Sequence, residues 1–447
     1  MAAWSGTLQA EAWFNELADA TVCAAKGSEV ILVSISAEQS DFVRFNHGRV
    51  RQPGSVTQSA AHVRVIDHDR QAATDCALHG DGSDLDRIRQ ATGLARELLA
   101  DLPEDPHILY STTVHSSSSH RRGSRPDSTH IASHVAARAI DLDLVGIYSA
   151  GTVYRGFANS LGQRNWHGVE SFNFDWSLYD RADKAVKASY AGFDWDAEAF
   201  NAKLQDSVHA LASMRQPSRR IEPGEYRAYL APRALDEVMG LVSWGGFSAH
   251  SMKTKGSPLL RMEQGARLSE RVTIAENTKE GLAPSFQGEG FTKPERVPLI
   301  SAGMLDSLLV SPRTAKEFNL VANGAGGSER PVSLDMDAGS LAMDDALGAL
   351  DTGIYINNLW YLNFSDRSAG RLTGMTRFAT FWVEHGRIVA PIDVMRFDDS
   401  LYRMLGDQLI DLTSEREMLL DPSTYDGRST ASARLPGALL KALRFTL

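Results

Sequence analysis

The sequence predicts an α+β fold whose largest part is a sheet-rich C-terminal domain. Helical patterns and short β-prone runs share the first half of the chain, and two polar stretches containing Ser, Pro and Arg interrupt them. Residues 351–400 then hold three closely spaced runs of β-branched and aromatic residues, which are typical of strands. At 447 residues the chain is long for one hydrophobic core, so we expect two or three domains.

The small N-terminal α/β part, residues 1–105, has the pattern of a helix, an antiparallel meander and a second helix. Apolar residues at near-helical spacing predict the first helix from Gln9 to Ala25. A stripe of apolar residues predicts the second helix from Ser83 to Leu102, where Pro103 ends it. Between these helices, β-prone runs occupy residues 29–37, 41–46, 55–67 and 71–78.

Residues 106–222 are the expected middle α/β part. The polar stretch from Pro103 to Arg125 predicts a loop that separates this part from the first. A second break at residues 216–223 leaves 223–447 as the C-terminal domain. Between the breaks, strand-like runs at 145–149, 153–159 and 168–179 lie between a helix that starts at Asp127 or Ser128 and a helix from Asp194 to Met214.

The stretch at 351–400 predicts the centre of the main core. Its three runs are Ile354–Phe364, Met375–Glu384 and Arg387–Phe397, and the last two are joined by a tight turn. In the middle run, Phe378 and Trp382 fall on one face of a strand, whereas Ala379, Phe381 and Val383 fall on the other. We therefore expect a central strand of a large sheet, covered on both faces.

Composition and charge exclude several classes of protein. A net charge of −10 without a basic patch argues against binding to nucleic acid. No run approaches the about 18 apolar residues that span a bilayer, and the first residues lack a leader pattern. Two cysteines, Cys23 and Cys76, are too few for a disulfide framework or a thiolate metal site. We expect a cytoplasmic protein that binds neither nucleic acid nor membrane.

Motifs that carry chemistry are sparse. His130 and His134 stand four residues apart on a predicted helix, as a metal-binding pair does, but no Glu follows the first and no third ligand is evident. Nucleophile-elbow, phosphate-loop and dinucleotide motifs are absent. The acidic pairs at 344–345 and 398–399 are adjacent in sequence, so their side chains diverge, and helix capping or solvation accounts for them.

Four segments together resemble one family. In order and spacing, the chain is similar to the TldD/PmbA proteins, once called modulators of DNA gyrase, at Phe42–Gln52, Phe157–Gly162, Pro298–Gly303 with 305–310, and Gly370–Val383 with Glu384–Ile388. The resemblance spans about residues 9 to 400. It implies a small N-terminal part, a middle part and a larger C-terminal domain built on a mostly antiparallel, strongly curved sheet.

The resemblance also implies where zinc would be bound, and this sequence departs from the pattern there. The TldD subunit holds zinc through His-Glu-x-x-x-His on a helix, where the Glu acts as general base. The corresponding segment here is Ala234–Gly256, whose one histidine is His250. Leu241, Val242 and Gly246 stand at the positions of the two His and the Glu, and Gly374–Ala379 replaces the segment with the family's cysteine ligand.

The chain therefore resembles the TldE (PmbA) side of the family, which implies a subunit without metal. Such a subunit pairs with a zinc-containing TldD-like chain in a heterodimeric metalloprotease that cleaves unfolded or short peptides, peptide maturation included. We expect it to complete the chamber and to bind an extended peptide along a sheet edge. The side chains expected to face the peptide or the partner are Trp244, His250 and Lys253, with Asn323 and Arg371 behind them.

Two alternatives stay open. The chain could be a self-sufficient peptidase or hydrolase that uses other residues, such as His130 and His134 with a carboxylate. It could also be a homodimeric peptide-binding protein without chemistry.

Overall fold

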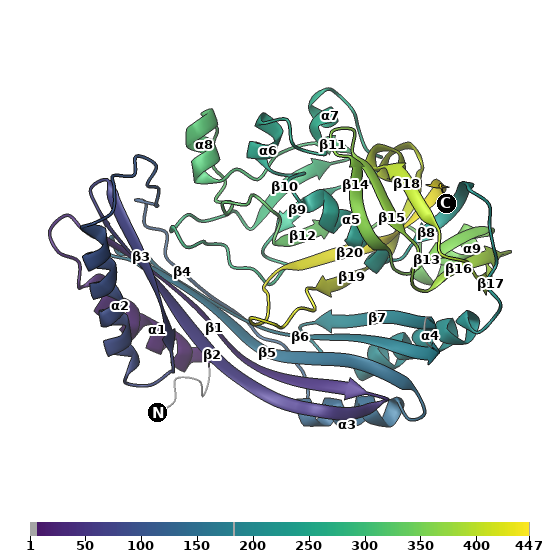
Figure 1. Cartoon of the computed structure of the whole chain (residues 1–447), viewed down its shortest axis with the longest axis horizontal. Coiled ribbons are helices and arrows are strands. Elements are labelled where there is room, and N and C mark those ends of the chain that lie inside the picture. Colours follow the sequence, from purple (N-terminus) through teal and green to yellow (C-terminus); the bar gives the residue numbers. More distant parts are fainter. Residues whose placement is uncertain (1–6, 182–183, 447) are drawn as a thin grey trace.

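The described residues form two large β-sheets, one from each half of the chain (Figure 1). The computed structural model describes residues 7–181 and 184–446. Helices lie against both sheets and strand pairing is mostly antiparallel, so the predicted α+β fold is confirmed. None of the described helices has the length and apolarity needed to cross a bilayer.

The N-terminal sheet is built from long strands that sweep in a curve past the C-terminal half in Figure 1. Its order is β3-β2-β1-β5-β6-β4, with β7 beside β6. The strands are β1 (Val30–Asn46), β2 (Arg49–Asp67), β3 (Arg70–Leu78), β4 (Ser117–Arg121), β5 (Asp143–Asn159), β6 (Arg164–Arg181) and β7 (Lys184–Gly192). The β-prone runs predicted at 29–37 and 41–46 join into β1, because the residues between them pair with both β2 and β5.

The two parts predicted at 1–105 and 106–222 contribute strands to this one sheet. β1 pairs along most of its length with β5, so Ser36 lies opposite Arg155. The polar loop expected at 103–125 also contains β4, which pairs in parallel with β6. Turn-rich residues separate these two parts in the sequence, but strand pairing joins them in one sheet. The second sheet starts at Gly224, directly after the break predicted at 216–223.

Helices cover the outer face of the N-terminal sheet. They are α1 (Thr7–Val22), α2 (Asp84–Leu99), α3 (Ser128–Arg138) and α4 (Ala197–Met214). Val33 and Ile35 of β1 pack under α1 and α2, whereas Val43 and Phe45, farther along the same face, pack toward α3. α3 begins as predicted, because the Asp127 side chain accepts a hydrogen bond from the third helical N–H. The inner face, with the even-numbered residues of β1, is left to the C-terminal half.

The C-terminal sheet has the order β11-β10-β9-β12-β20-β8-β13-β16-β17, and β14, β15, β18 and β19 join it through further pairings. Its strands are β8 (Gly224–Leu230), β9 (Ile274–Asn277), β10 (Arg296–Ser301), β11 (Met304–Leu305), β12 (Ser333–Met336), β13 (Gly353–Ile356), β14 (Trp360–Asp366), β15 (Arg371–Met375), β16 (Thr380–Glu384), β17 (Arg387–Pro391), β18 (Arg396–Ser400), β19 (Leu409–Leu420) and β20 (Ser432–Phe445). The helical segments are α5 (Pro232–Ser243), α6 (Ala249–Lys253), α7 (Leu260–Glu263), α8 (Pro312–Phe318), η1 (Met343–Asp345), α9 (Ala346–Leu350) and η2 (Arg403–Asp407).

The centre of this sheet is β20, and the prediction that Met375–Glu384 is its central strand is wrong. That run yields β15 and β16, and β16 lies next to the edge strand β17. The expected cover on both faces is present, because Phe381 packs toward α4 and Trp382 packs against Tyr226. β20 carries Pro436 and Gly437 and few β-branched residues, so local propensity did not reveal it.

A strap at residues 421–431, between β19 and β20, fastens the two sheets together. Its Arg428 is buried against the inner face of the N-terminal sheet, where the guanidinium donates to the carbonyls of Gly151 (3.1 Å) and Ser171 (2.9 Å). The backbone N–H of Arg428 donates to Glu38 (3.1 Å). Burial lowers the pKa of Arg428 to about 10, because desolvation disfavours its charged form. The cost of that burial is offset by these hydrogen bonds.

We predict that Arg428→Met lowers the free energy of unfolding by about 3 kcal/mol, because the buried carbonyls of Gly151 and Ser171 lose their donor. Urea denaturation of the purified chain measures this loss. The exposed Arg387→Met is the matched control and should change stability by less than about 0.5 kcal/mol. Equal stability of the two variants would contradict the role given to the strap.

Asp335 ties four strands of the C-terminal sheet with one buried carboxylate. It accepts hydrogen bonds from Arg416 of β19 (2.9 Å), Arg434 of β20 (2.8 and 2.9 Å) and Asn277 of β9 (2.7 Å). Burial acts to raise the pKa of Asp335, but these hydrogen bonds and the charges of Arg434 and Arg416 hold it below its ordinary value.

A carboxylate with a lowered pKa stabilises the fold above its unfolded pKa of about 3.9, and this stability is lost as pH falls through the lower folded value. We therefore predict that Asp335→Asn is less stable than the natural chain by about 3 kcal/mol at neutral pH, and that the gap narrows below about pH 4. Denaturation midpoints of both proteins between pH 7 and the acid limit test this. A gap that stays constant with pH would rule the account out.

Candidate functional site

The positions that the family resemblance aligns with a zinc motif carry no side-chain ligand atoms. Leu241 and Val242 lie on α5 and pack in the C-terminal core. Gly246 follows the helix, and its N–H donates to the carbonyl of Val242 (2.9 Å). A Cβ at Gly246 would approach that carbonyl oxygen to 2.3 Å, so a larger residue requires the backbone to move. This segment does not fit a zinc ion.

No other group takes the place of the motif within residues 7–181 and 184–446. Nowhere in these ranges do three or more His, Cys, Asp or Glu side chains gather in a way that could hold a metal. His130 is exposed on α3, whereas His134 contacts the Asn201 side chain (3.0 Å) and packs edge-on against Phe200. The helical spacing of the two histidines therefore gives one surface residue and one packing residue.

His250 and Lys253 are exposed on α6, which is short and held from below by a buried carboxylate. Glu329 accepts hydrogen bonds from the Ser248 hydroxyl (2.6 Å) and from the backbone N–H groups of His250 (2.8 Å) and Ser311 (2.7 Å). Burial acts to raise its pKa, but these hydrogen bonds and one from Thr314 hold the pKa of Glu329 below its ordinary value. Glu329 thus fixes the starts of α6 and α8 relative to each other.

Asn323 has a structural role. Its amide donates to the carbonyl of Leu308 (2.7 Å) and its side-chain oxygen accepts from the N–H of Val310 (2.9 Å). Both hydrogen bonds tie the loop at 319–330 to the segment before α8. The Asn323 side chain is therefore engaged within the chain, unlike His250 and Lys253.

Trp244 lies at the end of α5 and is 58% exposed. The guanidinium of Arg367, from the turn between β14 and β15, lies over the Trp244 ring (4.9 Å) and over Phe364 of β14 (5.1 Å). The same group donates to the carbonyls of Trp244 and Gly256. Arg367 therefore fastens the β14–β15 hairpin to α5 and α6 and holds Trp244 beside β14.

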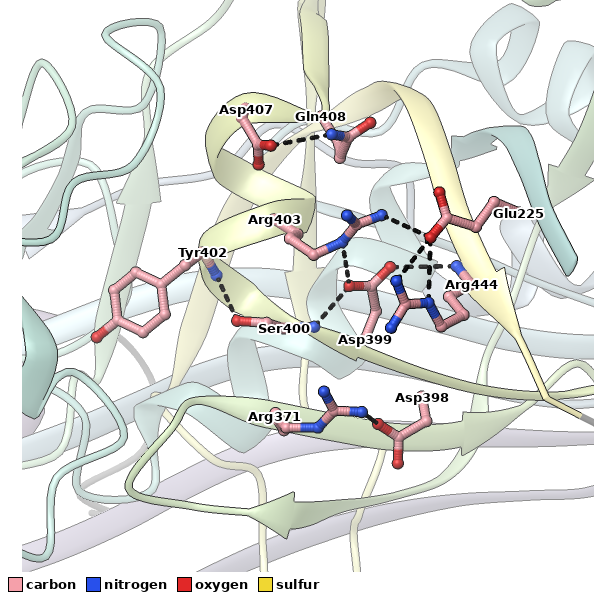
Figure 2. A network of polar contacts seen from close by, with 10 residues as sticks. All are labelled: Glu225, Arg371, Asp398, Asp399, Ser400, Tyr402, Arg403, Asp407, Gln408 and Arg444. Atoms are coloured by element: carbon pink, nitrogen blue, oxygen red, sulfur yellow. Dashed lines mark hydrogen bonds and ion pairs between the residues drawn. The ribbon is translucent and has the colours of Figure 1, made fainter.

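Arg371 of β15 is ion-paired with Asp398 of β18 and is not free to face a ligand (Figure 2). Figure 2 also shows that the neighbouring Asp399 points to the other side of its strand. There Asp399 accepts from Arg403 Nε (3.0 Å) and from the backbone N–H of Arg444 (3.1 Å). The two carboxylates diverge as predicted, but ion pairs hold them and not capping or solvent.

The Asp399 cluster joins β18, η2, β20 and β8. Arg403 and Arg444 both donate to Glu225 of β8, at 3.2 and 2.7 Å. Hydrogen bonding to Arg444 lowers the pKa of Glu225, with smaller effects from Arg403. This network holds β18 firmly to β20 and β8. Strand β15 pairs with β18, and β14 pairs with the other side of β15.

β14 is an edge strand with exposed aromatic side chains. In the described part of the chain it pairs only with β15, so its outer edge has no partner strand. Trp360 and Tyr361 are 39% and 75% exposed, and their rings lie 5.3 Å apart. Tyr361 has a φ of 55°, a left-handed conformation that is rare for a bulky residue. An unpaired edge with exposed aromatic residues is a surface that favours pairing with another chain.

A cavity of about 430 Å³ opens beside this edge. Trp360, Met375, Phe378 and Ile392 give it apolar walls, and Arg377, whose guanidinium lies over the Trp360 ring (4.4 Å), is its basic residue. The cavity therefore lies in the segment 374–379, where the resemblance places the family's cysteine ligand. Its lining also includes Ser218, Thr376, Thr380 and Asp393, so apolar walls and polar groups share the cavity.

Sequence reasoning missed Trp360 and Tyr361. It treated Ile354–Phe364 as one strand, whereas the chain breaks at Asn357 and Asn358 into β13 and β14, which lie in different parts of the sheet. The Asn pair, which disfavours strands, was the available signal. The exposure of β14 depends on non-local pairing and had no local signal.

Solved structures share this fold. One is a candidate modulator of a DNA gyrase from Thermotoga maritima (TM-score 0.76, 15% identity, 97% of this chain and 100% of that chain covered). Another is TldE from Thermococcus kodakarensis (TM-score 0.76, 14% identity, 98% and 99% covered). A candidate modulator of DNA gyrase from Bacteroides thetaiotaomicron is similar too (TM-score 0.73, 13% identity, 98% and 99% covered). At these identities the likeness establishes the fold.

Among curated proteins, none matches the sequence. The family model described as the PmbA/TldA metallopeptidase C-terminal domain matches residues 223–447, which is half of the chain and the whole of its second sheet. The family model matches the C-terminal half in sequence, and the solved structures share the fold of nearly the whole chain. The chain therefore belongs to the PmbA/TldD metallopeptidase family.

Proposed function

We propose that this chain is the TldE-like, metal-free subunit of a two-chain zinc metallopeptidase, and that it binds the extended peptide which its partner cleaves. The observation that carries this proposal is the chemistry of Leu241, Val242 and Gly246, which offer no ligand atom where the family places its zinc motif. Membership of a metallopeptidase family supports the proposal that another chain carries the metal. When bound in that partner, zinc polarises the scissile carbonyl and activates water.

The peptide is assigned to the outer edge of β14. Unpaired backbone groups on an edge strand can form a ladder with an extended peptide of any sequence. The edge is rigid, because Arg367 fastens one end of the hairpin to α5 and the Arg371–Asp398 ion pair holds β15 to β18. A fixed edge lowers the entropy lost on binding, which favours affinity without sequence selectivity.

Aromatic side chains mark both ends of this edge. Trp360 and Tyr361 lie at the start of β14, and Phe364 with Trp244 lies about 14 Å beyond Trp360 at about 3.4 Å per residue. The cavity beside Trp360 would take one apolar side chain of the peptide. Trp244, His250 and Lys253 remain exposed for the partner or the peptide, whereas Asn323 and Arg371 support the site from within.

We predict that the purified chain alone contains no stoichiometric zinc and cleaves no peptide, and that activity and zinc appear after co-expression with a TldD-like partner. Metal analysis and peptide cleavage of the co-purified complex measure this. Finding about one equivalent of zinc in the isolated chain would defeat the proposal, because the metal must then have ligands here.

We predict that Trp360→Ala combined with Tyr361→Ala raises the KM of the complex for unfolded peptides about tenfold with little change in kcat, because the lost contacts bind substrate and transition state alike. Tyr425→Ala is the control, since Tyr425 is 94% exposed on the strap. Co-purification is monitored in parallel. An unchanged KM, or loss of the complex with normal peptide affinity, would assign this edge another role.

A further inference from the structure

A second cavity, of about 280 Å³, lies between the two halves of the chain, far from β14 in sequence and in fold. Its floor is the inner face of the N-terminal sheet, and its roof is the C-terminal segment at 284–288. Gly290 lets this segment pack closely on the N-terminal sheet, because a Cβ at this position would approach the Phe157 ring to 2.9 Å. The Gly290 carbonyl also accepts from the Gln163 side chain (2.9 Å).

Strand register places one arginine at the centre of the cavity floor. Arg155 of β5 lies opposite Ser36 of β1 and His167 of β6, so the three side chains share the inner face. Arg155 Nη1 donates to the carbonyl of Tyr154 (2.8 Å). No carboxylate of the described residues forms an ion pair with Arg155, although its side chain is part-buried. A guanidinium has five N–H donors, so the one hydrogen bond to Tyr154 leaves donors of Arg155 for a ligand.

Two other partly buried arginines of this chain have carboxylate partners, whereas the buried guanidinium of Arg428 donates to main-chain carbonyls and the Ser171 hydroxyl. Arg233 pairs with Asp175 (2.7 Å), and Arg434 pairs with Asp335 (2.8 Å). Burial lowers the pKa of Arg155, because desolvation outweighs the attraction of Glu38. Glu38 forms no ion pair with Arg155, and its carboxylate accepts hydrogen bonds from Gln58, Ser40 and the strap instead. The positive charge of Arg155 is therefore left for a ligand.

The other charged groups on this face have partners of their own. Asp75 contacts His62 (2.9 Å) and lies three strands away from Arg155, about 14 Å at ordinary strand spacing. His167 is held between the Ser119 hydroxyl and the carbonyl of Leu282. Arg64 donates to the carbonyl of Leu109 (3.0 Å), and the charge of Glu289 acts on it. None of these groups neutralises Arg155.

The other residues that line the cavity indicate which kind of anion fits beside Arg155. Phe157, Phe286, Pro284 and Ala60 form apolar walls, and Ser34 and Ser36 add hydroxyls near the floor. The volume equals that of about nine water molecules in the liquid, which suits a small organic molecule. One guanidinium matches one carboxylate with two parallel hydrogen bonds, whereas a phosphate dianion would leave charge facing apolar walls.

From the unpaired Arg155 and the apolar walls, we infer that this cavity binds the carboxylate of a small molecule or chain end with an apolar body. Arg155 holds the carboxylate, the Ser34 and Ser36 hydroxyls assist, and Phe157 and Phe286 enclose the apolar part. The site belongs to the isolated chain and depends on neither zinc nor a partner.

Isothermal titration of the full chain with 3-phenylpropionate and its neutral amide tests this inference. The carboxylate should bind about tenfold to a hundredfold more tightly than the amide. Gly-Gly-Phe with a free or an amidated C-terminus forms the second arm and shows whether chain ends enter as well. Absence of binding by both carboxylates at millimolar concentration, or equal binding of acid and amide, overturns the proposal.

Variants locate the binding. Arg155→Met should abolish the preference for the carboxylate, Arg155→Lys should keep part of it, and Ala60→Phe should block binding with Arg155 intact. Arg49→Met, at the exposed start of β2 in the same sheet, is the control and should bind normally. Thermal melting confirms folding, and the Lys and Phe variants decide the matter if the Met variant unfolds. A carboxylate preference that survives in folded Arg155→Met overturns the assignment.

Discussion

The structure depends first on the pairing of β20 at the centre of the C-terminal sheet. β20 contacts β8, β12, β18 and β19, so elements from the whole second half of the chain meet on one strand. Its apolar residues Leu435, Leu440 and Leu443 enter the core, while Arg434 reaches the buried Asp335. Removing this strand would expose a hydrophobic core and deprive the buried Asp335 of Arg434, one of its charge partners.

The candidate peptide edge, β14, is held in place through its connection to β20. Asp399 links β18 to the backbone of β20 (Figure 2). Strand β15 pairs with β18, and β14 pairs with β15, so each strand holds the next in place. At the far end, Arg367 closes the hairpin onto α5 and α6. The last edge is open. An edge that is both fixed and unpaired is a costly feature for a chain to retain unless it binds something.

The part of the fold that local chemistry determines could be predicted from the sequence. The Asp127 cap located α3, and apolar spacing located α2 and α4, because helices are built from neighbouring residues. Pairings across long separations were not accessible. Residues before and after position 105 meet in one sheet, and Arg371 finds Asp398 across a strand pair, so the side chains expected at the site were partly engaged elsewhere.

We propose that two chains divide the roles of a peptidase, with zinc in the partner and an aromatic sheet edge in this chain. Amide hydrogen exchange of the assembled complex, with and without a non-cleavable extended peptide, tests this division most directly. We expect the peptide to slow exchange along β14, from Trp360 to Asp366, with little change on the β17 edge. Protection that leaves β14 unchanged would contradict it.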